Sequence, residues 1–153
     1  MRKNWLLLGI GLVVAVLAVA AVACSDDDDD DNGGEDGATT LSASLSEVDG
    51  NGVTGSATLT EADGTTEVVV EMAGLDGTHA NHLHHGDCDA QGEVHVTLTE
   101  LEADADGDAT ATTSGFPSDP EDPGIDHFAA GHYAAVHEAG GAPGPVISCG
   151  DVS

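Results

Sequence analysis

Four of the chain's eight histidines lie in the segment THANHLHHGDC, residues 78–88. If this segment is a β-strand, residues two apart point to the same face. His82 and His84 then project together, while His79 and His85 project to the other side. Two imidazoles in this arrangement are a natural pair of ligands for copper or zinc. A polar strand that is merely rich in histidine would show the same pattern, so the pair alone leaves both readings open.

The elements that must position these histidines are short strands, because helix signals are weak throughout the chain. In SASLSEV and SATLTE, larger side chains alternate with small polar ones, which is the period of a half-buried strand. DGNG and ADG supply the positive-φ residues that tight hairpins need. Roughly eight such segments at regular spacing predict an antiparallel β-sandwich or barrel.

The N-terminus reads as a targeting segment followed by a tether. Residues 1–23 have a basic start and a long apolar run, and the small residues before Cys24 resemble a bacterial lipoprotein signal. This resemblance implies cleavage before Cys24 and lipidation of its thiol; a plain signal peptide and an uncleaved membrane anchor are the alternatives. Residues 24–39 include six consecutive aspartates and are predicted to be a disordered acidic tether. Residues 40–153 are predicted to form one folded domain.

The charge balance limits the classes of partner. Arg2 and Lys3 are the only basic residues apart from histidine, against 29 Asp and Glu, and the formal net charge is −27. Nothing in the domain can neutralise phosphates, so nucleic-acid binding is excluded, and membrane contact is expected only through the lipid anchor. Such acidity suits a protein that works in high salt, where screening weakens self-repulsion.

Two cysteines remain if Cys24 carries a lipid. Cys88 and Cys149 lie far apart in the sequence, and in an oxidising compartment such a pair is read as a disulfide. Two free buried thiols are the alternative. The leader places the domain outside the cytoplasm, in the periplasm or at the cell surface, anchored to the membrane by lipid.

The motifs occur in an order that resembles copper/zinc superoxide dismutases. The stretch from VDGNG to HLHHGDC is similar to the N-terminal half of that family, and DHFAAGHYAAVHEAGG and VISCGDV are similar to its later segments. The resemblance implies an eight-stranded Greek-key β-barrel. It also implies a role for each of six residues: copper ligation by His82, His84 and His137, bracing of the site by His79, and a Cys88–Cys149 disulfide. His127 and His132 fall on non-ligand positions, where surface histidines are expected.

The sequence also departs from that family. Only DAQGE separates Cys88 from the next strand, so the family's zinc-binding loop is missing and no zinc site is expected. His95 is the only nearby candidate for a fourth copper ligand, although it could equally be one polar residue on a strand. Val146 stands where the family has an arginine that guides superoxide.

The expected function is therefore an exported copper protein that dismutes superoxide to oxygen and hydrogen peroxide. A non-enzymatic surface carrier or buffer with the same copper ligands is one alternative, and a metal-free structural barrel is another. The expected partner is superoxide or a copper donor, and the resemblance raises a homodimer as one oligomeric state.

Overall fold

The computed structural model describes residues 38–62, 64–116, 124–139 and 144–153. Ten strands and one short 3-10 helix make up the described part of the chain, in the following order: β1(Thr39–Glu47), β2(Thr54–Ala62), β3(Thr65–Ala73), β4(Thr78–His79), β5(Asn81–Gly86), β6(Gln91–Thr97), β7(Leu101–Glu102), β8(Ala109–Phe116), η1(Ile125–Ala129), β9(His132–His137) and β10(Val146–Asp151). The leader, Cys24 and the aspartate run lie outside the described residues. The division into leader, tether and domain therefore stays a prediction.

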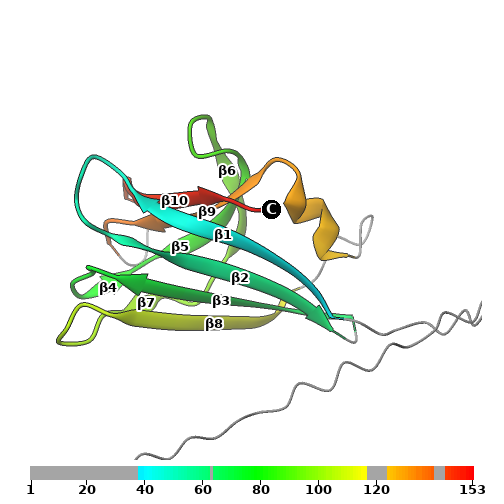
Figure 1. Ribbon diagram of the computed structural model, residues 1–153, viewed down its shortest axis with the longest axis horizontal. Coiled ribbons are helices and arrows are strands. Elements are labelled where there is room, and N and C mark those ends of the chain that lie inside the picture. Colours follow the sequence, from blue (N-terminus) through cyan, green and yellow to red (C-terminus); the bar gives the residue numbers. More distant parts are fainter. Residues whose placement is uncertain (1–37, 63, 117–123, 140–143) are drawn as a thin grey trace, which may run out of the picture. The chain divides into compact units, whose positions relative to one another are not determined.

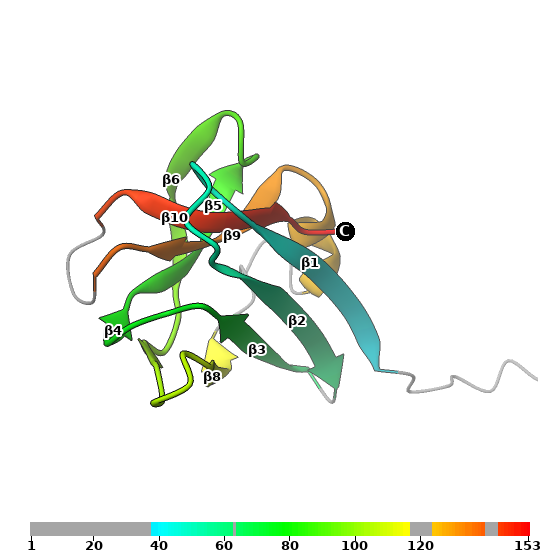
Figure 2. The same cartoon turned by 60° about the vertical axis from the view of Figure 1, so that its left-hand side comes forward.

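Eight of the strands form one antiparallel sheet in the order β6-β5-β9-β10-β1-β2-β3-β8. One half of this sheet, β1, β2, β3 and β8, forms a broad layer, and β5, β6, β9 and β10 form the other half (Figure 1). Turning the molecule shows that the sheet curls, so that the two halves face each other across an interior (Figure 2). The remaining strands β4 and β7 pair with each other.

Strict alternation of side chains explains why the broad half of the sheet forms. In β3, Val68, Val70 and Met72 are buried, whereas Glu67 and Glu71 are exposed and Val69 is half-buried. Each strand therefore turns one apolar row inward. These rows meet apolar residues of the other half in one continuous core, to which Leu59, Val68, Leu83, Phe128 and Val136 belong.

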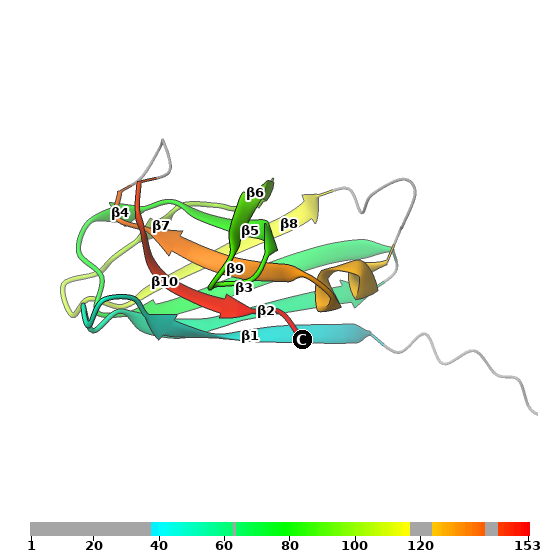
Figure 3. The same cartoon turned by 90° about the horizontal axis from the view of Figure 1, so that it is seen from above.

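The half that contains β5 and β9 differs because it is covered on both faces. All six residues of β9 are buried, as are the first four of β5. Ala134 and Val136 point into the main core, whereas Tyr133 and Ala135 belong to a smaller cluster with Cys149. Viewed from above, β9 lies between β5 and β10 (Figure 3). Any polar side chain on these strands must therefore find partners inside the protein.

The prediction of an all-β, antiparallel architecture is confirmed, and the sheet is curled as in a barrel or sandwich. No α-helix occurs among the described residues, and none of the helical segments there could cross a bilayer.

Candidate metal centre

The pairing of β5 with β9 brings three histidines to one face. His84 lies opposite Tyr133 and His82 opposite Ala135 in the register of the two strands. The backbone amide of His137 donates to the carbonyl of Ala80, which continues the same ladder. Because side chains alternate along a strand, His82, His84 and His137 project to the same side as Tyr133.

We call His82, His84 and His137 the inner histidine cluster. One ring nitrogen of each lies within 4.8 Å of the others. The three side chains are almost fully enclosed, with 4%, 5% and 3% of their surface exposed. The Nε2 atoms of His84 and His137 are 3.3 Å apart. Three imidazoles that meet in a buried space could bind a metal ion.

Backbone carbonyls hold two of these rings by their far nitrogens. His84 Nδ1 lies 3.1 Å from the Gly92 oxygen, and His137 Nδ1 lies 2.7 Å from the Gly144 oxygen. A carbonyl oxygen only accepts, so each Nδ1 donates a hydrogen. Each Nε2 of a neutral ring then carries a lone pair that faces the other. This pattern, with the second nitrogen bonded to a carbonyl, is the one that metal-binding histidines show.

His82 completes the set with a nitrogen that lacks a protein partner. Its Nδ1 atom is buried and makes no hydrogen bond within the described residues. Burial, then the nearby His137, then His84, lower the pKa of His82 to about 4. Burial also lowers the pKa of His84, against the hydrogen bond to Gly92, and His137 and His85 add to the lowering. Both rings are therefore neutral at pH 7, which is the form that binds metal.

Two further side chains support the inner cluster. His79 is buried, and its Nδ1 and Nε2 atoms each lie 2.8 Å from a carbonyl oxygen, of His137 and Asp76 respectively. This ring ties the segment before β4 to the end of β9. Tyr133 stacks on His84 with ring centroids 4.9 Å apart. Its pKa is raised by burial and by the negative charge of Asp87, with the Gly92 backbone acting in the opposite direction.

A disulfide lies on the same side of the sheet. Cys88 and Cys149, the two cysteines that the sequence suggests as a pair, are joined with Cα atoms 6.0 Å apart. Cys149 packs with Tyr133 and Ala135, and Cys88 contacts this small cluster. The bond links the loop after β5 to β10 and so holds the strands on either side of β9.

His95, which the sequence left open as either a fourth ligand or one polar residue on a strand, does not lie with the inner cluster. Val94 pairs with His84 and Val96 with Leu83, which leaves His95 as the extra residue of a bulge in β6. A bulge re-aims a side chain, and His95 meets His85 and His132 instead. The spacing of the sequence contains no signal for this bulge.

We call His85, His95 and His132 the outer histidine cluster. One ring nitrogen of each lies within 4.8 Å of the others. His132 is buried and His127 half-buried beside this cluster, so the expectation that both are surface histidines is wrong. Burial lowers the pKa of His132, with further lowering from His85 and His95, while the Ala130 carbonyl raises it and His127 lowers it.

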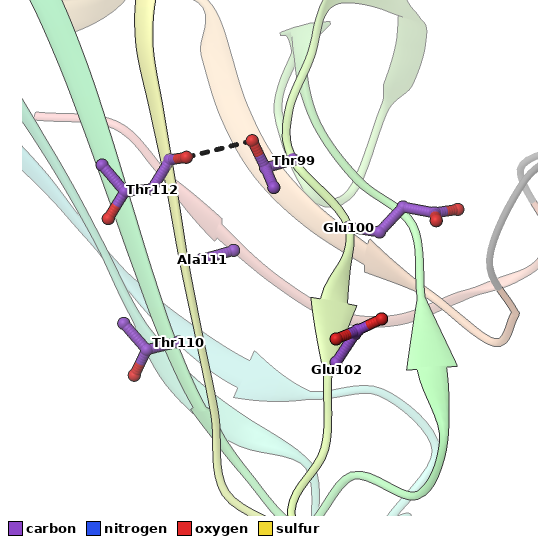
Figure 4. A pocket seen from close by; sticks show the side chains of 6 residues that line it. All are labelled: Thr99, Glu100, Glu102, Thr110, Ala111 and Thr112. Carbon is purple, nitrogen blue, oxygen red and sulfur yellow. Dashed lines mark hydrogen bonds between the residues drawn. The ribbon is translucent and has the colours of Figure 1, made fainter.

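A separate cavity of about 480 Å³ lies between β8 and the segment around β7 (Figure 4). The threonines Thr99, Thr110 and Thr112 line it, together with Glu100, Glu102 and Ala111. The Thr99 hydroxyl donates to the Thr112 carbonyl across it at 3.0 Å. No histidine lines this cavity, so it adds no nitrogen ligand to either histidine cluster.

Comparison with models of protein families shows to which family the chain belongs. The family model of the CHRD domain matches residues 37–146, which is well over half of the sequence. The chain belongs to the CHRD domain family. A comparison with curated proteins finds no match. CHRD domains are typical of extracellular and secreted proteins, and the Cys88–Cys149 disulfide is consistent with such a location.

This membership overturns the resemblance to copper/zinc superoxide dismutases. With it, the expectation of a dismutase or any oxidoreductase is wrong, and the dismutase type of Greek-key barrel loses its support. Histidines two apart on a strand, glycine-rich hairpins and a late cysteine are features that an unrelated β domain can share. The missing zinc loop and the valine at position 146 are the places where the sequence already departed from that family.

Proposed function

We propose that this CHRD domain is a non-enzymatic copper-binding module that works outside the cytoplasm. The ligands are His82, His84 and His137. One observation carries the proposal: two enclosed Nε2 atoms face each other at 3.3 Å, and both rings donate their other nitrogen to a carbonyl. In neutral rings so held, no hydrogen separates the two lone pairs, and a bound cation would remove their repulsion.

The donor set favours copper. The inner cluster consists of imidazoles alone, with no carboxylate or thiolate among its three members. Calcium and magnesium prefer oxygen ligands, which excludes them as the resident ion. Imidazole suits copper, zinc and nickel, and among divalent ions of the first row copper binds most tightly. A set of three nitrogens also suits Cu(I).

The surroundings suit a carrier or buffer. The chain has a formal net charge of −27, which raises the local concentration of cations and repels anions. A copper donor is the partner that this role requires. Lipidation at Cys24, if it occurs, would keep the domain at the membrane surface where exported copper passes.

A metal-free structural domain is the second candidate. It is favoured by a main core and a disulfide that are complete without any histidine. CHRD membership supports this candidate as well, because nothing in it supports dismutase activity. On this view the inner cluster is a buried polar network within the sheet.

Copper titration of the purified protein separates the two candidates. We expect an ion bound at the inner cluster, whose Cu(II) electron paramagnetic resonance spectrum shows nitrogen hyperfine structure. His84→Gln should weaken copper binding at the inner cluster by more than about 100-fold, because loss of a residue that only supports a ligand costs about 10–100-fold. His85→Gln is the matched control, because it changes the adjacent residue on the opposite face. Absence of tight copper binding to the natural protein would leave the structural candidate.

A further inference from the structure

The outer histidine cluster lies on the other side of the same strands. His85 pairs directly with His132 across β5 and β9. His95 comes from the bulge in β6 and stacks on His85, with ring centroids 4.3 Å apart and planes 14° from parallel. Three adjacent strands thus each contribute one imidazole, and the nitrogens gather within 4.8 Å.

The hydrogen bonds of this cluster leave a position that a cation can take. His132 Nδ1 lies 3.2 Å from the Ala130 carbonyl oxygen, so it donates there and its Nε2 carries a lone pair. His95 Nδ1 lies 3.0 Å from that Nε2. A single hydrogen held between these two nitrogens accounts for the contact in the metal-free protein. A metal ion would displace this proton to solvent and bind both nitrogens.

One side of the cluster is closed and the other is open. Phe128, part of the main core, packs against His95 and His132 at centroid distances of 5.3 and 5.1 Å. His127 flanks the same two rings, at 5.6 and 5.7 Å. Its Nδ1 contacts the Gly124 carbonyl at 2.5 Å, and its buried Nε2 has no partner in the described part of the chain. His85 is exposed, which gives an ion a route from solvent.

We propose that His85, His95 and His132 form a second metal site, separate from the inner cluster, that binds a divalent ion of the zinc class. Three imidazoles with an open position are a common arrangement for zinc. The open side leaves room for water or for a ligand from another molecule. This inference does not depend on the identity of the ion at the inner cluster, because the two sets share no residue.

Three single variants, two of them on adjacent residues, test the second site. The full-length protein is titrated with Co(II), as a spectroscopic probe, and with Zn(II), in excess calcium to occupy carboxylate sites such as the aspartate run. We expect His84→Gln to retain one ion with the absorption bands of nitrogen-ligated Co(II), because only the inner cluster is damaged. His85→Gln should lose that ion. His132→Gln should lose it as well.

The outcomes are distinct for the two proposals. If His84→Gln binds no Co(II) or Zn(II), or if His85→Gln and His132→Gln bind as many ions as the natural protein, the second site is overturned. The cluster would then be a stacked and hydrogen-bonded histidine group only. Failure of copper to bind the inner cluster would overturn the proposed function while leaving this test unaffected. Circular dichroism of each variant establishes that loss of binding is not loss of folding.

Discussion

The two histidine clusters occupy opposite faces of the same strands and differ in their surroundings. The inner cluster is closed by Tyr133 and by carbonyls of Gly92 and Gly144, and every member is at most 5% exposed. The outer cluster lies at the end of the main core and includes one exposed ring, His85. Neighbouring residues of one strand thus enter environments of very different solvent access, because consecutive side chains point to opposite faces.

This difference in solvent access predicts how fast each site should exchange its ion. An ion in the inner cluster would be shielded from water and exchange slowly, because the side chains around it must move first. An ion in the outer cluster would exchange with solvent and accept an outside ligand. Both clusters depend on the same backbone, so changes in that backbone should affect them together, whereas changes in a single ring should not.

The largest effect should come from truncating the core side chain of β5 that lies on the opposite face from His82 and His84. Leu83 is fully buried in the main core, between His82 and His84 in the chain. Leu83→Ala should lower the free energy of unfolding by about 2–5 kcal/mol, because it leaves a cavity. Urea unfolding measures this loss, and both metal sites should weaken. Val94→Ala on the neighbouring strand, at a side chain that is 40% exposed, is the control. Equal effects of the two changes would contradict the described packing.

A substitution at Gly92 should disturb both histidine clusters at once. Its carbonyl accepts from His84, and a Cβ atom at this position would meet the backbone of His85, with the His85 carbonyl carbon 2.9 Å away. Gly92→Ala should therefore push β6 from β5 and cost about 1–3 kcal/mol in unfolding free energy. Metal affinity should fall at both clusters in calorimetric titrations.

The matched control is Gly124→Ala. A Cβ there would meet only ordinary contacts, the nearest at 3.8 Å. If Gly92→Ala weakened one cluster and left the other at its natural affinity, the proposed coupling through β6 would be wrong.

The pH dependence of stability should reveal the enclosed histidines. Because the pKa of His82 is about 4 in the folded domain and ordinarily 6.5, the unfolded chain binds more protons between these values. Stability of the metal-free protein should therefore fall as pH decreases, by about 1 kcal/mol from pH 7 to pH 5.5 for His82 alone. The lowered pKa values of His84 and His132 act in the same direction.

Thermal unfolding in high salt measures this dependence while repulsion between carboxylates is screened. His82→Asn should make the dependence shallower over the same range. An unchanged slope would show that His82 is not the group that titrates.

The smallest effect is expected at Tyr133. Its buried hydroxyl makes no well-aligned hydrogen bond among the described residues and interacts only weakly with the Gly92 backbone, so Tyr133→Phe should change the unfolding free energy by less than about 1 kcal/mol. Copper affinity should stay the same, because the hydroxyl is not a ligand in the proposed set. A clear loss of copper binding would add Tyr133 to the inner site.

Part of both sites could be predicted from the sequence. The spacing of His82 and His84 predicted a shared face, and the position of His85 predicted the opposite one. The same rule, applied to HYAAVH, separates His132 from His137, because they are five residues apart. That signal shows that the two histidines lie on opposite faces of their strand, but only the pairing of β5 with β9 places His132 on the face of His85.

The positions of His95 and His127 and the family of the chain could not be predicted from the sequence. The role of His95 depends on a bulge, and a bulge changes side-chain direction without changing the alternation of residue types that sequence reasoning uses. His127 reaches the outer cluster through a 3-10 turn whose path is set by the packing of Phe128 into the core. Family membership was misjudged because short motifs in a β domain carry less information than the whole length of the chain.

The all-β class, the acidic charge and the assignment of neighbouring histidines to opposite faces follow from the sequence alone. These features depend only on residue type and on the two-residue period of a strand. Only the tertiary structure decided which strands are neighbours, and therefore which histidines meet. His137 lies 53 residues from His84, and His132 lies 37 residues from His95. Contacts over such distances depend on the order β6-β5-β9 in the sheet, which the burial of the whole core selects.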